Sequence, residues 1–162
     1  MKQPEHGSMI NGQALGEVSQ LRYGLFPMSF NGCELIAICN ALCRLGKPRN
    51  ITEIAQFMER YSVLLGLFGC NVYRVGKGLE KFGVPFRRAD SISDAEMFIV
   101  SYWTGRVLMS SVHTVFCTQE NGVITVYNCA NRCGEPRKYS SAEEAFGRHK
   151  PLAVYLIDPK ES

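Results

Sequence analysis

The chain has 162 residues, and 18 lysines and arginines against 15 aspartates and glutamates give it a formal net charge of +3. Its composition, 46% hydrophobic and 20% charged, is that of a globular protein and excludes collagen, a coiled coil and a long disordered tail. The small charge excludes a dedicated nucleic-acid-binding domain, and the length predicts a lead-in over 1–20 and a single domain over 21–162.

Helices are predicted for the first half of the chain. Residues 1–20 are glycine-rich and weakly periodic, so we expect a flexible lead-in with a short edge strand near its end. A largely buried helix follows, because apolar residues recur at helical spacing from residue 35 to 45. Asn31 is its predicted N-cap, Glu34 completes a capping box and Gly46 ends it.

Further elements follow in chain order. Three more helices are predicted, capped at Asn50, at Asn71 and, for a helix reaching residue 104, at Ser93. Five strands are predicted, over 84–87, 107–110, 112–118, 123–127 and 152–157. A short helical turn, from Ser140 with Glu143 to Phe146, precedes the last of them. Asn121-Gly122 predicts a two-residue hairpin turn. Helices first and antiparallel strands second indicate an α+β fold, with helices packed on one side of a sheet.

Seven cysteines are too few for a disulfide scaffold, and none forms a CxxC pair. The N-terminus lacks the apolar run of a secretory signal, and no stretch of about 18 apolar residues is present. We therefore expect a cytoplasmic protein with reduced thiols and no membrane contact. A zinc site built from Cys129, Cys133 and His149 is disfavoured by the ligand spacing, and no cofactor or metal is implied.

Cys33 differs from the other cysteines in its position. The predicted cap at Asn31 puts it in the first turn of a helix, where unpaired N–H groups and the helix dipole favour an anion. Such positions lower the pKa of a thiol, and the thiolate is its reactive form. Cys33 is therefore the candidate nucleophile, and the alternative is a small residue in a tight loop-to-helix junction.

A nucleophilic thiol needs a base, which itself needs an orienting group. His6 lies in the lead-in and His149 in a loop, whereas His113 lies near the start of a predicted strand. With a two-residue hairpin loop, Asn128 is a diagonal neighbour of His113 on the same face of the sheet. A four-residue loop would put the two residues opposite each other, and a three-residue loop would separate them. The alternatives are a structural strand histidine and a turn asparagine.

These features resemble papain-like cysteine peptidases of the compact bacterial type, and are similar to the bacteriocin leader-processing peptidases in fold. The resemblance spans about residues 25–130 and rests on NGCELIA (31–37), NALCRLGK (40–47), HTVF (113–116) and VYN (126–128). It implies the papain-like fold, and a Cys33–His113–Asn128 triad that cleaves a peptide or small amide through an acyl-enzyme. No nucleic-acid partner is implied.

The resemblance also implies an oxyanion hole built from the Cys33 backbone N–H and an upstream side-chain amide. The family usually has a glutamine about six residues before the cysteine, where this chain has Pro27. The remaining candidates for this amide are Asn31, Gln20 and, further away, Gln13. Trp103 and Tyr102 are candidates for lining a substrate groove. Glu34 also departs from the glycine or serine that usually follows the nucleophile.

Two alternatives stay open. An acyltransferase or transglutaminase-like enzyme shares the order of cysteine and histidine but usually has aspartate as its third residue. A catalytically silent papain-like module that binds a peptide is the alternative that the missing glutamine favours.

Overall fold

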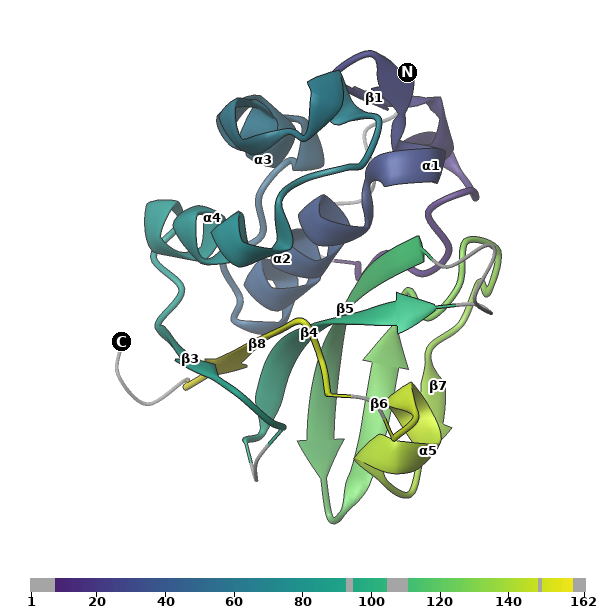
Figure 1. Cartoon of the computed structure of the whole chain (residues 1–162), viewed down its shortest axis with the longest axis vertical. Helices are drawn as coiled ribbons and strands as arrows, with labels where there is room; N and C mark the ends of the chain where they lie inside the picture. Colours follow the sequence, from purple (N-terminus) through teal and green to yellow (C-terminus); the bar gives the residue numbers. More distant parts are fainter. Residues whose placement is uncertain (1–7, 93–94, 105–110, 149, 159–162) are drawn as a thin grey trace.

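The computed structural model describes residues 8–92, 95–104, 111–148 and 150–158 (Figure 1). Its N-terminal helices pack on one face of a C-terminal antiparallel sheet, which confirms the predicted α+β class. Within these residues no helix combines the length and apolar character needed to cross a membrane.

The helices are mostly short, and several are single 3₁₀ turns, which are labelled η. They are η1 (Glu17–Gln20), α1 (Met28–Asn31), α2 (Cys33–Arg44), α3 (Ile51–Met58), η2 (Glu59–Tyr61), η3 (Leu64–Gly66), η4 (Val72–Arg74), α4 (Val75–Lys81) and α5 (Ala142–Phe146). The predicted caps Asn50 and Asn71 are confirmed, because each side chain accepts a hydrogen bond from the backbone N–H two residues later. Gly46 follows α2 with a φ of 69°, the left-handed conformation expected after a helix.

Six strands form the main sheet, in the order β3-β8-β4-β5-β6-β7, and every neighbouring pair is antiparallel. They are β3 (Phe86–Ala89), β4 (Met97–Thr104), β5 (Ser111–Glu120), β6 (Val123–Tyr127), β7 (Arg137–Tyr139) and β8 (Ala153–Ile157). A separate two-stranded ribbon, β1 (Arg22–Tyr23) with β2 (Phe26–Pro27), precedes α1.

The predicted helix that ends at residue 104 is wrong, because Met97–Thr104 is strand β4. This strand is central, lying between β8 and β5, and its first five residues are buried whichever face of the sheet they point to. A strand buried on both faces has a continuous apolar run in place of alternation, and such a run does not distinguish strand from helix. The predicted strand 107–110 lies outside the described residues.

The hairpin was predicted correctly. Asn121 and Gly122 have φ angles of 51° and 78°, as a type I′ turn requires. The register pairs Glu120 with Val123 and Phe116 with Tyr127. This register was derived from the two-residue turn, so the turn chemistry alone determined which residues of the two strands face each other.

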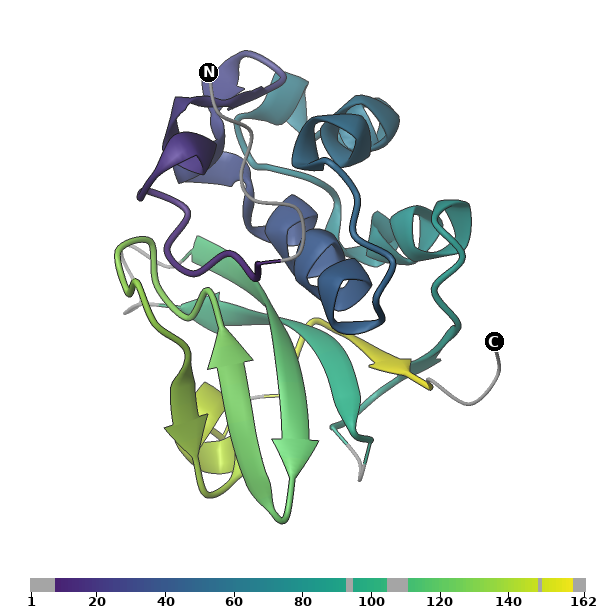
Figure 2. The ribbon, with the colours of Figure 1, turned by 180° about the vertical axis from the view of Figure 1, so that it is seen from behind.

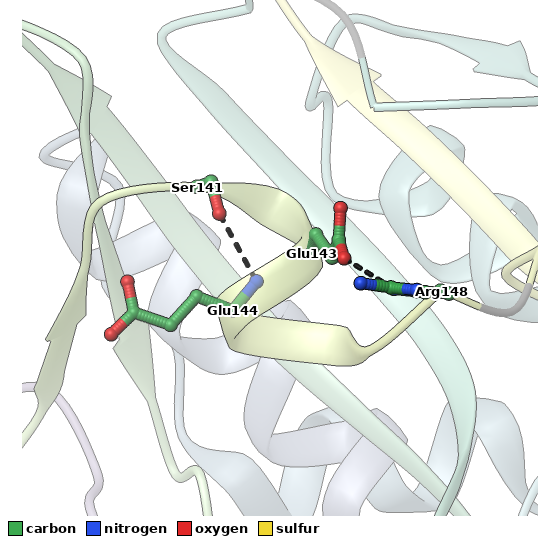
Figure 3. Close-up of polar contacts among 4 residues, drawn as sticks. All are labelled: Ser141, Glu143, Glu144 and Arg148. Atoms are coloured by element: carbon green, nitrogen blue, oxygen red, sulfur yellow. Dashed lines mark hydrogen bonds and ion pairs between the residues drawn. The ribbon is translucent and has the colours of Figure 1, made fainter.

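Helix α5 was also predicted, but its cap is displaced by one residue. Ser141, and not Ser140, accepts a hydrogen bond from the Glu144 N–H, at 3.1 Å (Figure 3). Glu143 instead forms an ion pair with Arg148.

Two apolar cores lie on opposite faces of the sheet. One packs α2, α3 and α4 against the face that carries Ile99, Phe116 and Tyr155. The other is closed by α5 and contains Phe98 and Val115. Helix α2 packs along β5 (Figure 1), and the backbone of Thr114, the residue after the predicted base, faces Cys33 at the start of α2.

Candidate active site

Cys33 is the first residue of α2, and 6% of its surface is exposed. Helix α1 runs into α2 through Gly32, where a Cβ would lie 2.7 Å from the Met28 carbonyl oxygen, so this tight junction requires glycine. Gly32 is the N-cap and supplies no side-chain hydrogen bond. The predicted capping box of Asn31 and Glu34 is therefore wrong.

Asn31 clamps the chain instead of capping the helix. Its Nδ2 donates to the Tyr23 and Gly66 carbonyl oxygens, at 2.9 and 2.7 Å, and the side chain is buried. Both amide hydrogens are thus used, which leaves Asn31 no side-chain donor for an oxyanion. The loop that follows η3 is held beside the start of α2 as a result.

The Cys33 thiol has a raised pKa, in contrast to the lowered value expected at a helix N-terminus. Burial is the main cause and the charge of Glu34 is the second. The backbone N–H groups of Thr114 and Glu34 face the thiol and act in the opposite direction. Cys33 is therefore a neutral thiol in the resting protein, against the β5 residue that follows His113.

His113 lies near the start of β5 and is 9% exposed. Its Nε2 lies 2.7 Å from the Asn128 carbonyl oxygen, and its ring meets the Tyr102 ring edge-on, with a centroid distance of 6.2 Å. Burial lowers the pKa of the imidazole, and the Asn128 carbonyl opposes this effect. His113 is therefore a neutral, oriented imidazole.

Asn128 does contact His113, but through its backbone and not through its side chain. Pairing of β6 with β5 ends at Tyr127, and Asn128 leaves the strand with a φ of 59°. Its Oδ1 accepts from the N–H groups of Gly12 and Gln13, at 3.1 and 3.0 Å. The side chain thus fixes the loop, and the loop directs the carbonyl to His113.

The segment 8–20, predicted as part of a flexible lead-in, packs against this loop and against α1 and α2 (Figure 2). Gln13 is 2% exposed; its Nε2 donates to the Ser29 carbonyl, and its Oε1 accepts from Asn128 at 3.3 Å. Gln13 is therefore the upstream amide that the fold brings to the Asn128 loop. Gln20 is exposed and donates to the Ser19 hydroxyl.

Trp103 lies on β4 opposite Val112, one residue beyond the Tyr102–His113 pair, and is 55% exposed. Burial is the main cause of the raised pKa of Tyr102, and the charge of Cys33 is the last of several smaller causes. Tyr102 contacts the rings of His113 and Phe146 on the face of the sheet that α5 covers.

Cys33 and His113 make no direct hydrogen bond with each other in the described structure, and each is nearly buried. A surface pocket lies elsewhere, at the C-terminal end of α2, and includes Arg44, Met97 and Glu120. In the described residues no three histidine, cysteine or acidic side chains are grouped to hold a metal ion. His6 and His149 lie outside these residues.

No family model, curated protein or solved structure matches the chain. A functional assignment therefore depends on the geometry of the residues themselves. Gln13 and Glu34 are the residues whose importance the sequence understated. A glutamate inside an otherwise apolar helical stretch was the available signal for Glu34, whereas Gln13 stands in a segment without periodicity.

Proposed function

We propose that the chain is a papain-like thiol hydrolase that cleaves a peptide or amide bond through an acyl-enzyme on Cys33. One observation carries the proposal: the hydrogen bond of His113 Nε2 to the Asn128 carbonyl oxygen. It supplies a base with a defined orientation and a defined tautomer, in the strand whose next residue, Thr114, lies with its backbone against the Cys33 thiol.

The tautomer follows from the acceptor. A carbonyl oxygen only accepts, so Nε2 must carry the hydrogen of this bond. Burial keeps the ring neutral, and a neutral imidazole has one protonated nitrogen. Nδ1 of His113 is therefore left with a free lone pair, as a general base requires.

The proposed reaction begins with transfer of the Cys33 proton to His113 Nδ1 as the sulfur attacks the carbonyl carbon. The backbone N–H groups of Thr114 and Glu34, which face the thiol, stabilise the negative charge that develops during the attack. Gln13 is the side-chain amide that adjoins the Asn128 loop. The imidazolium then protonates the leaving amine, which gives a thioester. Water, deprotonated by His113, releases the acid and restores the thiol.

Because Cys33 and His113 are both neutral in the resting protein, the Cys33 proton moves to His113 during the attack and not before it. This differs from a preformed thiolate–imidazolium pair, and it predicts that thiol reactivity depends strongly on the base. Exposed Trp103 is the side chain we propose for contact with the substrate.

A catalytically silent peptide-binding module is the second candidate. It is favoured by the burial of Cys33 and by the absence, in the described structure, of a direct Cys33–His113 hydrogen bond. Such a module would keep peptide binding when Cys33 is replaced by serine and would show no acylation.

The test uses iodoacetamide labelling followed at each cysteine by peptide mass spectrometry, together with acylation by p-nitrophenyl acetate. We expect His113→Ala to slow the labelling of Cys33 roughly 100-fold, a typical general-base contribution, whereas the labelling of half-buried Cys43, whose pKa is lowered by a hydrogen bond from Cys39, should not depend on His113. His6→Ala is the matched control and leaves the rate unchanged. Equal labelling of the accessible cysteines, with no dependence on His113, would refute the proposal.

The fate of an acyl-Cys33 species separates the two enzyme classes. A hydrolase releases acetate, whereas an acyltransferase forms an amide with an added amine. No acylation of wild type, together with peptide binding that survives Cys33→Ser, would favour the silent module.

A further inference from the structure

Glu34 is a buried carboxyl group that the proposed reaction does not use. It follows Cys33 in the first turn of α2 and is 2% exposed. Its Oε2 has no hydrogen-bond partner and is one of two such buried side-chain atoms identified among the described residues. An unpartnered, buried carboxylate oxygen is costly when charged, so this environment favours the protonated form.

The loop after η3 closes over this carboxyl group. At Gly69 a Cβ would lie 3.0 Å from Glu34 Oε2 and 3.2 Å from the Asn31 carbonyl oxygen, and φ there is 69°. The close approach and the left-handed backbone both require glycine. Asn31 donates to the carbonyl oxygen of Gly66, the last residue of η3, so the loop is anchored directly before Gly69 and the carboxyl group has little room to turn towards solvent.

The titratable groups that face Glu34 are the thiols of Cys33 and Cys70 and the phenol of Tyr23. Each is neutral when protonated and negative when ionised. The remaining groups that face it are backbone N–H groups and the Thr114 hydroxyl of β5, and no lysine or arginine of the described chain is among them. Glu34 therefore has polar neighbours but no cation to balance a charge.

Burial raises the pKa of Glu34 to about 7, with the nearby donors acting in the opposite direction. Ionised Glu34 in turn raises the pKa of Cys33, as the second cause after burial. The two groups thus influence each other at the start of α2, where a thiolate is needed.

We infer that Glu34 is a positioning residue whose protonation state controls the reactivity of Cys33: protonated Glu34 permits thiolate formation and ionised Glu34 opposes it. The inference rests on the proposed role of Cys33 as nucleophile. It means that the reactivity of Cys33 rises less steeply with pH than that of an ordinary thiol. The rise in pH that deprotonates Cys33 also ionises Glu34, and the charge of Glu34 opposes the formation of the thiolate.

The experiment compares wild type with Glu34→Gln, which keeps the size of the side chain and removes the charge. Glu53→Gln is the matched control, because Glu53 is an exposed glutamate in the first turn of α3. The rate of Cys33 alkylation by iodoacetamide is measured from about pH 5 to pH 9, across the ordinary pKa values of both groups, and thermal unfolding verifies that each variant is folded.

We expect Glu34→Gln to alkylate about tenfold faster than wild type near pH 8, since a neighbouring like charge typically moves a pKa by about one unit or more. Near pH 5.5 the two rates should agree within about twofold, because residue 34 is then uncharged in both proteins, as protonated glutamate or as glutamine. A constant ratio at all pH values, or coincident profiles, would overturn the inference. A purely structural role for Glu34 would change the rates without this pH dependence.

A second measurement needs no substitution of Glu34. The carboxyl carbon of Glu34 is titrated by ¹³C NMR in wild type and in Cys33→Ser, and we expect a midpoint near 7, well above the ordinary value of about 4.3 for a glutamate. A midpoint in the ordinary range would overturn the inference directly. Failure of the proposed function is seen separately, as Cys33 alkylation that does not depend on His113.

Discussion

The buried carboxyl group of Glu34 makes the stability of the protein depend on pH, in the direction opposite to that of a paired surface carboxylate. Its pKa is raised from 4.5 to about 7 in the folded chain, with burial as the main cause. Between these values the folded state holds a proton that the unfolded state has lost. The free energy of unfolding therefore falls as pH rises through this range.

The size of the effect follows from the same values. A difference between 4.5 and about 7, at about 1.4 kcal/mol for each pKa unit, corresponds to about 3 kcal/mol of stability lost above pH 7. Glu34→Gln has no such ionisation. Its stability relative to wild type should thus rise by about 3 kcal/mol from about pH 4 to pH 8, with the steepest change near pH 5–7.

Urea unfolding of both proteins at several pH values measures this difference. The lowered pKa of His113 has the opposite effect, because the protein loses stability as the pH falls and the buried imidazole must take up a proton. This contribution is common to wild type and Glu34→Gln, so it cancels from the difference between them. Glu53→Gln is again the control and should follow wild type. A stability difference between Glu34→Gln and wild type that stays constant with pH would refute the reasoning.

Three other substitutions test the packing around the site. Gly78→Ala in α4 should destabilise by about 1–3 kcal/mol in urea unfolding, although alanine favours a helix, because its Cβ would lie 2.7 Å from Ile38 Cδ1 and 2.9 Å from Met58 Sδ; a gain in stability would contradict this. Asn128→Ala should cost about 2–4 kcal/mol, since two backbone N–H groups lose their acceptor and alanine disfavours a positive φ, and an unchanged free energy of unfolding would contradict this. Asn121→Ala should cost about 1 kcal/mol, since its φ of 51° suits asparagine, and an unchanged unfolding midpoint would count against a type I′ turn.

Local rules predicted much of the fold. The apolar stripe predicted α2, the asparagine caps predicted the starts of α3 and η4, and Asn-Gly predicted the β5–β6 register. The helix predicted up to residue 104 failed, since a strand buried on both faces carries no alternation from which its period can be read.

The candidate site was only partly predictable. Cys33 and His113 were identified from their element types, and the fold brings the start of α2 against β5 near His113. The diagonal contact of Asn128 failed because Asn128 leaves the strand, so its carbonyl and not its side chain meets His113. Gln13 was a distant candidate, because its contact with Asn128 joins residues 115 positions apart.

The sequence by itself determined the α+β class, the starts of α3 and η4 and the hairpin register, because these depend on neighbours within a few residues. Only the tertiary structure decided the ionisation of the site. A helix N-terminus favours a thiolate locally, but burial and an adjacent unpartnered carboxyl raise the pKa of Cys33. Desolvation depends on what the whole chain packs around a group, and short-range patterns do not encode it.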